Sequence, residues 1–278
     1  MAQSTDRTPA SIVPESIREI EPDCGSGHIL VEADNGLYRI YEERGERSRE
    51  SPELILRHNL FGLDIDDRAA QLASFALLMR ARQDDRRVFN RSNLRLNIVS
   101  LQESLHLNIN NLWQQLNLHQ QNKIGSVGDM LAENSAKDNI DSVEYQLLTR
   151  TLKLFLNAKT LGSLIQVPAE DEAALRILKD AIYDLKRNGD IQQRNASEKF
   201  YPYIEQAWIL SQKYNVVVSN PPYMGLKYFN EKLKKEVVKH FPLSKHDLFA
   251  MFIERNLNFL CSNGISSQIT MLGWLYIQ

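Results

Sequence analysis

The sequence predicts an α/β fold with a doubly wound sheet, and three segments carry this prediction. Residues 16–43 are predicted to form, in order, a strand, a glycine-containing loop and a helix. Residues 59–82 are predicted to form a strand that ends in an acid, followed by an amphipathic helix. Residues 214–219 form a β-branched strand that leads directly into an Asn-Pro-Pro-Tyr sequence. At 278 residues, one large α/β domain with insertions is expected.

The first unit places a glycine loop between a weak strand and a regular helix. Residues 16–20 are less apolar than the continuous run expected of a central parallel strand. The helix at 28–43 has apolar residues at helical spacing. Gly25 and Gly27 let the backbone turn sharply and approach a ligand, and the helix start offers free amides. The alternative is a glycine turn that only connects two elements.

The second unit ends its strand at Asp64. In doubly wound folds an acid at this place accepts hydrogen bonds from ribose hydroxyls, ~20 residues beyond the glycine loop. Asp64 follows Gly27 by 37 residues, and a charged connection with a short helix at 52–58 accounts for the excess. The alternative role for Asp64 is a helix N-cap, but Asp66 or Asp67 fits that role better.

The remaining chain is assigned to a leader, an insertion and a last helix and strand. Residues 1–15 are expected to be a loose leader, and residues 16–278 an incomplete catalytic core with a large helical insertion at about 103–210. A helix is predicted at 247–260, with Ser262-Asn263-Gly264 as its stop and a strand at 265–272.

The Asn-Pro-Pro-Tyr motif at 220–223 is the strongest chemical signal. Pro221 and Pro222 fix the backbone and end the strand, so they hold the Asn220 amide and the Tyr223 ring in place. The Asn220 side-chain oxygen and the Pro221 carbonyl can accept hydrogen bonds from the exocyclic amine of a purine, and Tyr223 can stack on the base. An amine held in this way can attack a sulfonium methyl group. Correct positioning is the main source of catalysis, so no His or Cys nucleophile is required. The alternative is a proline turn with an incidental Asn and Tyr.

The only charge pattern that points to a nucleic-acid partner is local. The formal net charge is -2, which excludes a global cationic field. Six lysines follow the Asn-Pro-Pro-Tyr motif, which we call the clamp motif. They occupy positions 227, 232, 234, 235, 239 and 245. They are either phosphate contacts or a solvated helix face.

The cysteines and the first residues exclude other classes of protein. Cys24 and Cys261 have no His or Cys at ligand spacing, so no metal site is expected. Cys24 and His28 are expected to be packing residues rather than catalysts. The first twenty residues lack the apolar segment of a signal peptide and no long uncharged run follows, so we expect a cytoplasmic protein.

Together, three motifs resemble those of S-adenosylmethionine-dependent adenine-N6 DNA methyltransferases, in the same order. They are EPDCGSG at 21–27, FGLDID at 61–66 and NPPY at 220–223. More narrowly, four segments resemble PglX, the methyltransferase family of BREX phage-resistance systems: GSGHILVEA at 25–33, PELILRHNLFGLDIDDRAAQLASFALLMRA at 52–81, LGSLIQV at 161–167 and VVVSNPPYMG at 216–225. The resemblance implies a partial Rossmann-like S-adenosylmethionine methyltransferase sheet with a large helical insertion.

The resemblance also implies the reaction. It is the transfer of a methyl group from S-adenosyl-L-methionine to adenine N6 in double-stranded DNA, with the target adenine flipped out of the stack. Other BREX defence proteins would be candidate partners, and no membrane is expected to be involved.

Carried over residue by residue, the resemblance assigns two sets of site residues. The implied cofactor-binding residues are Glu21, Cys24, Gly25 and Gly27 near the methionine end, Asp64 at the ribose, Ile65 at the adenine ring and Ser163 at its amino group. Asp129 competes with Ser163 for the last role, and we favour Ser163. The residues that would hold the target base are Asn220, Pro221, Pro222 and Tyr223.

The chain departs from the family pattern at the loop and at both ends. The family's loop begins with Asp and has a small residue where this chain has Asp23, whose carboxylate can repel that of the cofactor. Only twenty residues precede Glu21, and the chain stops at Gln278, soon after a strand match at 269–274. We therefore expect a chain truncated at both ends, without a target-recognition region.

Two alternative functions follow. One is a catalytically inactive remnant that only binds partners in a defence complex. The other is an enzyme that uses the same clamp to methylate protein glutamine or RNA guanine. The long helical insertion favours DNA as the substrate.

Overall fold

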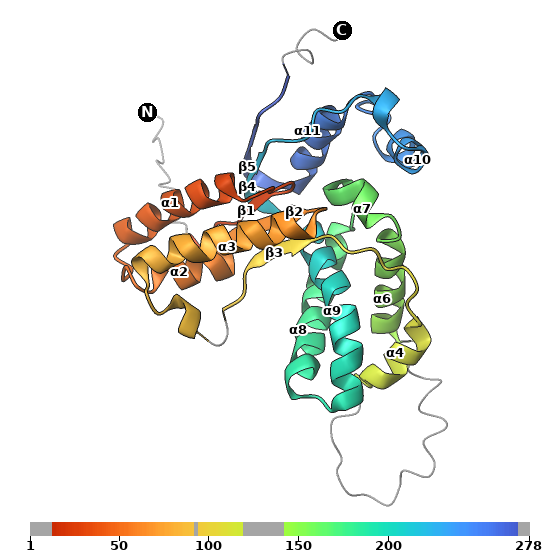
Figure 1. Cartoon of the computed structure of the whole chain (residues 1–278), viewed down its shortest axis with the longest axis horizontal. Coiled ribbons are helices and arrows are strands. Elements are labelled where there is room, and N and C mark those ends of the chain that lie inside the picture. Colours follow the sequence, from red (N-terminus) through yellow and green to blue (C-terminus); the bar gives the residue numbers. More distant parts are fainter. Residues whose placement is uncertain (1–12, 92–93, 119–141, 272–278) are drawn as a thin grey trace, which may run out of the picture.

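The computed structural model describes residues 13–91, 94–118 and 142–271, and its centre is a parallel sheet (Figure 1). The five strands have the order β3-β2-β1-β4-β5, and every neighbouring pair is parallel. Their bounds are β1 Glu19–Glu21, β2 Leu60–Asp64, β3 Asn97–Ser100, β4 Tyr214–Ser219 and β5 Leu260–Gln268. This confirms the predicted Rossmann-like α/β fold. The strand order reverses between β1 and β4, which is where ligands bind in such sheets.

Strand β1 is central although it is short and carries two acids. It pairs with β2 through Glu19↔Leu60 and with β4 through Glu19↔Val216. Ile20 is fully buried, and Glu21 is buried with it at the carboxyl end. The strand predicted at 16–20 therefore exists but runs from 19 to 21. Pairing on both sides compensates for the poor apolar character of the segment.

Strand β2 separates two hydrophobic cores because its side chains alternate between the faces of the sheet. Phe61 and Leu63 pack on the side of the helices that follow β3, whereas Leu60 packs with the helices before it. Helices α1 His28–Glu43 and α3 Asp67–Asp84 form the second layer together with α2 Ser51–Leu54 and the π-helical turn Ile55–Asn59. The helices predicted at 28–43 and 68–82 are thus confirmed.

Gly27 is needed where α1 approaches α3. Its φ is 80°, and a Cβ atom there would lie 2.8 Å from the Cα and Cβ of Ala73. This glycine therefore permits close packing of the two helices and the tight turn before α1. Asp66 caps α3 by accepting a hydrogen bond from the Arg68 amide at 2.8 Å, as predicted.

The chain between β3 and β4 is helical throughout most of its described part. The longer elements are α4 Ile109–Leu116, α6 Val143–Leu154, α7 Ala158–Leu161, α8 Glu172–Asn188 and α9 Ile191–Ser211. Figure 1 shows α8 and α9 side by side in a bundle that extends away from the sheet. Trp113, Phe155 and Phe200 are fully buried in it. A single 3-10 turn, η5 Gly162–Leu164, contacts β2 beside the sheet.

The chain after β4 returns to the sheet through two helices. They are α10 Glu231–His240 and α11 Leu248–Phe259. An antiparallel bridge between Gly225 and Asp247 closes the loop that carries α10. The predicted helix stop at 262–264 is wrong, because these residues lie inside β5. There the register with β4 shifts between Tyr214↔Leu260 and Val216↔Ile265, so the local turn is a bulge in the strand.

Some predicted features fall on parts of the chain that are not described. Most of the leader at 1–15, Asp129 and the end of the strand predicted at 265–272 lie outside the described residues. Within the described ranges, no helix is long and apolar enough to cross a membrane. The same residues contain no group of three or more metal-binding side chains.

Candidate active site

A cleft of about 300 Å³ lies at the carboxyl ends of β1, β2 and β4. Its walls come from the loop after β1, the end of β2, the α7–η5 turn, the clamp motif and α11. The lining residues are Pro22, Asp23, Asp64, Ile65, Thr160, Leu161, Gly162, Ser163, Asn220, Pro222, Leu248 and Phe252. The fold therefore brings together segments that are more than two hundred residues apart in the sequence.

Asp64 ties the glycine loop to the end of β2. One carboxylate oxygen accepts a hydrogen bond from the Gly25 amide at 2.8 Å, and the other accepts from the Asp66 amide at 2.8 Å. Each oxygen keeps a further lone pair for a ligand hydroxyl. Gly25 has φ +51° and open space around its Cβ position, so it is the backbone angle that requires glycine.

Cys24 belongs to the loop but faces the protein interior. Its side chain is 3% exposed and packs with Leu30 and its neighbours in the core between α1 and α3. The Cys24 amide donates to the Leu63 carbonyl at 2.9 Å, which fixes the start of the loop against β2. Cys24, Glu21, Gly25 and Gly27 are not among the residues that line the cleft.

The carboxyl groups of buried Glu21 and half-buried Asp23 lie at the cleft, and each has one buried oxygen without a hydrogen-bond partner among the described residues. Glu21 is 4% exposed, and neither Glu21 Oε2 nor Asp23 Oδ1 has a hydrogen-bond partner in the described part of the chain. Burial, reinforced by Asp23, raises the pKa of Glu21 to about 9. Burial, reinforced by Asp64, raises the pKa of Asp23 to about 7. Such uncompensated acids are expected to bind a cationic or hydrogen-bond-donating ligand.

The opposite wall of the cleft comes from η5 and the helix before it. The Ser163 hydroxyl donates to the Pro22 carbonyl, which joins η5 to the loop after β1. Gly162 has φ +56°, and a Cβ atom there would lie 3.0 Å from the Ile65 side chain. Lys159 closes α7 onto β2 by donating to the Ile65 carbonyl at 2.8 Å and to Asp67 at 2.7 Å. The segment with Ser163 thus packs against Ile65 and lines the cleft together with Asp64.

The clamp motif follows β4 directly and is mostly exposed. Asn220 and Pro222 line the cleft, and Pro221 is buried beneath them. The Tyr223 ring is 48% exposed and meets Phe249 edge-on, with the ring centroids 6.1 Å apart. Its hydroxyl donates to the Ile269 carbonyl at 3.1 Å. The Tyr223 ring is therefore oriented by α11 and by the end of β5, with one part left open.

Two apolar lining residues, Leu248 and Phe252, were not predicted from the sequence. They lie one turn apart on α11 and face the cleft beside Ile65 and Ser163. An apolar position on a helix has the same periodicity whether it faces a core or a ligand cleft. The nearby clamp motif was the only available signal for them.

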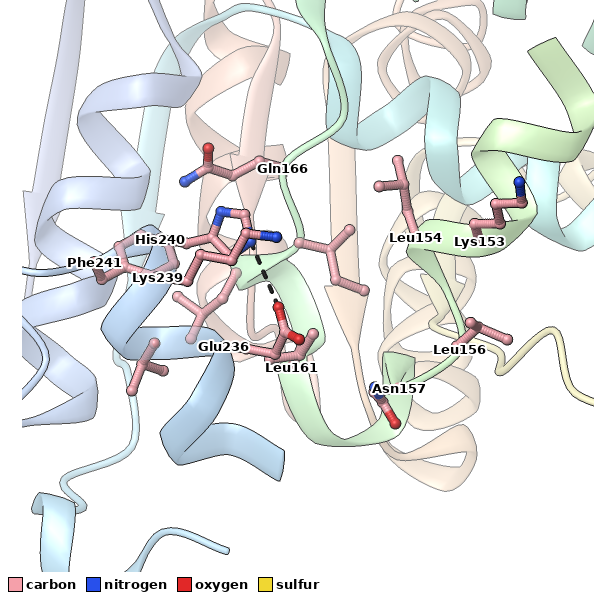
Figure 2. Close-up of a pocket in the computed structure, with 13 residues that line it drawn as sticks. Lys153, Leu154, Leu156, Asn157, Leu161, Gln166, Glu236, Lys239, His240 and Phe241 are labelled. Carbon is pink, nitrogen blue, oxygen red and sulfur yellow. Dashed lines mark ion pairs between the residues drawn. The ribbon is translucent and has the colours of Figure 1, made fainter. Parts of the chain in front are cut away.

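A second cavity, of about 330 Å³, lies on the other side of Leu161 (Figure 2). Its apolar wall includes Leu161, Val237 and Phe241. Glu236 Oε2 and His240 Nε2 of α10 lie 3.5 Å apart. Figure 2 shows this pair on one side of the cavity and Leu154 of α6 on the other. None of the residues in the motifs at 21–27, 61–66 and 220–223 lines it, whereas the segment at 161–167 contributes Leu161, Leu164, Ile165 and Gln166.

Comparison with known proteins gives one family and several relatives. Residues 58–278 match the family described as Eco57I restriction-modification methylase. The chain is 58% identical, over 99% of its length and 23% of the relative's, to adenine-specific methyltransferase BrxX of Escherichia coli O9:H4 (strain HS). It is 32% identical to adenine-specific methyltransferase PglX of Lacticaseibacillus casei (strain Zhang), over 95% of the chain and 20% of that protein. The chain therefore spans a fifth to a quarter of the length of these curated relatives.

Proposed function

The chain belongs to the Eco57I restriction-modification methylase family, and on that premise we propose that it is the catalytic core of a site-specific DNA methyltransferase. It transfers a methyl group from S-adenosyl-L-methionine to adenine N6 and serves a BREX phage-defence system. One observation carries the proposal: Asp64, Ser163 and Asn220 line a single cleft at the switch point of the sheet. The names of two relatives, both adenine-specific methyltransferases, support adenine as the target.

The residues of the cleft fit the parts of S-adenosyl-L-methionine. The unpartnered oxygen of Glu21, which is buried next to the cleft, suits its amino group, because a buried acid gains most from a cationic donor. Asp64 has free lone pairs for the ribose hydroxyls, and Ile65 and Phe252 offer apolar surface for the adenine ring. When bound, the cofactor supplies a methyl group made electrophilic by the positive charge on sulfur.

The clamp residues hold the target amine. Asn220 Oδ1 and the Pro221 carbonyl accept hydrogen bonds from its two hydrogens, which favours a pyramidal nitrogen with a localised lone pair. The exposed face of Tyr223 stacks on the base. The nitrogen becomes acidic once it is alkylated, so Asn220 Oδ1 or solvent at this exposed site is a sufficient proton acceptor. Positioning then supplies most of the catalysis.

The segment after the clamp supplies cationic side chains for the DNA backbone. Lys227, Lys232, Lys235 and Lys239 are exposed on the loop that the Gly225–Asp247 bridge closes. Because this loop begins two residues after Tyr223, it lies next to the place where a flipped base would enter. Contacts between lysines and phosphates would hold the duplex there without reading its sequence.

The test is a binding titration followed by a transfer assay. We expect the full chain to bind S-adenosyl-L-methionine, and the Asp64→Asn variant to bind it far more weakly. Labelled methyl should then be transferred to DNA and be recovered as N6-methyladenine. Binding without transfer would indicate an inactive remnant, and transfer to protein glutamine or to RNA would replace DNA as the substrate. Absence of cofactor binding would refute the proposed function for this chain.

A further inference from the structure

Helix α11 connects the cofactor side of the cleft with the clamp, and one of its residues is buried against the cofactor-side wall. We propose that Arg255 is a positioning residue that holds residues 162–165 in the shape that receives the adenine ring of the cofactor. The inference rests on the proposed function, because it assumes that the cleft binds S-adenosyl-L-methionine.

The guanidinium of Arg255 binds backbone carbonyls from two segments. Its side chain is 4% exposed, and Nε donates to the Ser163 carbonyl at 2.8 Å. Nη2 donates to the Ile165 carbonyl at 2.8 Å and to the Leu210 carbonyl at 3.3 Å. The central guanidinium carbon lies 3.8 Å from the centroid of the Phe259 ring, which fixes the plane of the group. A planar fork with these partners sets the positions of both wall carbonyls.

The wall segment is held by packing as well as by hydrogen bonds, because Leu164 and Ile165 are buried in two different hydrophobic clusters. η5 is one 3-10 turn outside the sheet, and it begins at Gly162, whose φ is +56°. The Ser163 hydroxyl is already used on the Pro22 carbonyl, and its own carbonyl is used by Arg255. These two hydrogen bonds of Ser163 hold residues 162–165 against the loop after β1 and against α11. They thereby set the distance between this segment and Ile65.

Burying an arginine at this position costs free energy unless its N–H groups donate hydrogen bonds. No carboxylate pairs with Arg255 among the described residues, and burial lowers its pKa to about 9. Apolar side chains of similar volume usually stabilise a core at least as well as a buried charge does. The buried guanidinium is thus explained by the three carbonyls that it binds.

The next residue makes the equivalent connection to the clamp. Asn256 Nδ2 donates to the Ser219 hydroxyl at 2.8 Å, and Ser219 directly precedes Asn220. Leu248 and Phe252, at the start of the same helix, line the cleft itself. Neighbouring residues of α11 therefore contact different sides of the site: Arg255 binds the cofactor side and Asn256 the clamp side. Asn256 thus provides a matched comparison for Arg255.

The experiment measures how well the full chain distinguishes two ligands. S-adenosylhomocysteine and S-inosylhomocysteine differ at the adenine amino position, and their affinities are measured for wild type and variants. We expect Arg255→Lys to weaken S-adenosylhomocysteine binding about tenfold, by the loss of a charged hydrogen bond, and to reduce the preference for it. We expect Asn256→Ala to keep both affinities but to slow methyl transfer.

A remote variant controls for loss of stability. Tyr41→Phe removes a buried hydrogen bond from the Tyr41 hydroxyl to Asn59 at 2.9 Å, far from the cleft in the α1 core. It should lower the melting temperature without changing the ligand preference. If the lysine variant does not unfold cooperatively, the two ligand affinities are measured for Arg255→Gln instead.

The possible outcomes separate the two hypotheses. If Arg255→Lys or Arg255→Gln binds both ligands as wild type does, the inference is wrong. If neither variant folds, Arg255 has a structural role only, and the inference is likewise overturned. If wild type binds neither ligand, the proposed function fails instead.

Discussion

The loop after β1 and the clamp after β4 follow neighbouring parallel strands, yet one is acidic and largely buried while the other is uncharged and mostly exposed. Glu21 is 4% exposed, and Asp23 beside it has a buried carboxyl oxygen without a partner. Tyr223 is 48% exposed, and Asn220 is exposed as well. The loop after β1 therefore suits recognition by charge, whereas the clamp suits recognition by a rigid shape.

This difference determines which changes should affect which half of the reaction. Buried acids carry a desolvation penalty until a cationic ligand arrives, so pH and charge variants should act on cofactor binding. The clamp owes its geometry to two prolines and to contacts with α11, so truncations there should act on the transfer step.

The largest expected effect comes from the clamp. Asn220→Ala removes one of two acceptors for the target amine, so transfer of labelled methyl to DNA should fall by about a hundredfold or more. The dissociation constant for S-adenosyl-L-methionine should change little. The exposed Asn188→Ala variant at the end of α8 is the control. A parallel loss of cofactor affinity in Asn220→Ala would remove the distinction between the two sides.

Asp64→Asn should weaken binding of the cofactor. The amide keeps the size of the carboxylate but weakens its bonds to the Gly25 amide and to the ribose hydroxyls, so S-adenosyl-L-methionine affinity should fall by about tenfold to a hundredfold. Isothermal titration measures the loss. Asp66→Asn, which alters only the cap of α3, should bind nearly as wild type does. Equal losses in the two variants would point to helix capping instead.

Glu21→Gln tests the burial of charge through stability. With a pKa of about 9 in the folded protein and 4.5 as its ordinary value, Glu21 binds its proton more tightly in the folded state. The free energy of unfolding should therefore fall as pH rises from about 4.5 to 9. Relative to wild type, Glu21→Gln should be about equally stable at pH ~4.5 and more stable by at least ~1 kcal/mol at pH ~8.

Urea unfolding at both pH values measures this difference. The exposed Glu42→Gln variant of α1 should show the same pH dependence as wild type. An unchanged pH slope in Glu21→Gln would mean that Glu21 is ionised and solvated in the folded protein.

Asp23→Ala should give the smallest effect. The pKa of Asp23 is raised only to about 7, so its carboxylate is still mostly charged at pH ~8 and should repel the carboxylate of the cofactor there. Removing it should strengthen S-adenosyl-L-methionine binding about threefold at pH ~8 and hardly at all at pH ~6. Binding titrations at the two pH values provide the check, with Asp184→Ala on α8 as control. Weaker binding at pH ~8 would show that Asp23 attracts the cofactor's cationic groups instead.

The elements best predicted from the sequence are those with a strong local pattern. The helix at 28–43 and the strand at 214–219 coincide with α1 and β4, because periodicity and β-branching act within each segment. Strand β3 was not predicted, since its four residues are all half-buried and show no alternation. The start of β5 was placed wrongly, because Asn263 and Gly264 look like a turn unless the pairing with β4 is known.

The candidate site was predictable where it depends on strand ends. Asp64 and Asn220 each end a predicted strand, and parallel strands bring their carboxyl ends to one edge of the sheet. The burial of Glu21 was not predictable, because it results from pairing on both sides of β1. The contacts of Arg255 depend on three segments that only the tertiary fold brings together.

The double pairing of β1 also sets an order for folding during synthesis. Arg18, just before β1, donates its amide to the Asn215 side chain, which lies 197 residues further along the chain. Until β4 has left the ribosome, one edge of β1 lacks its neighbour and the cleft lacks its clamp. The nascent chain thus has neither a finished sheet nor a finished cleft until β4, α11 and β5 have been made, at about residue 268, and the structural core and the candidate active site are completed in the same late step.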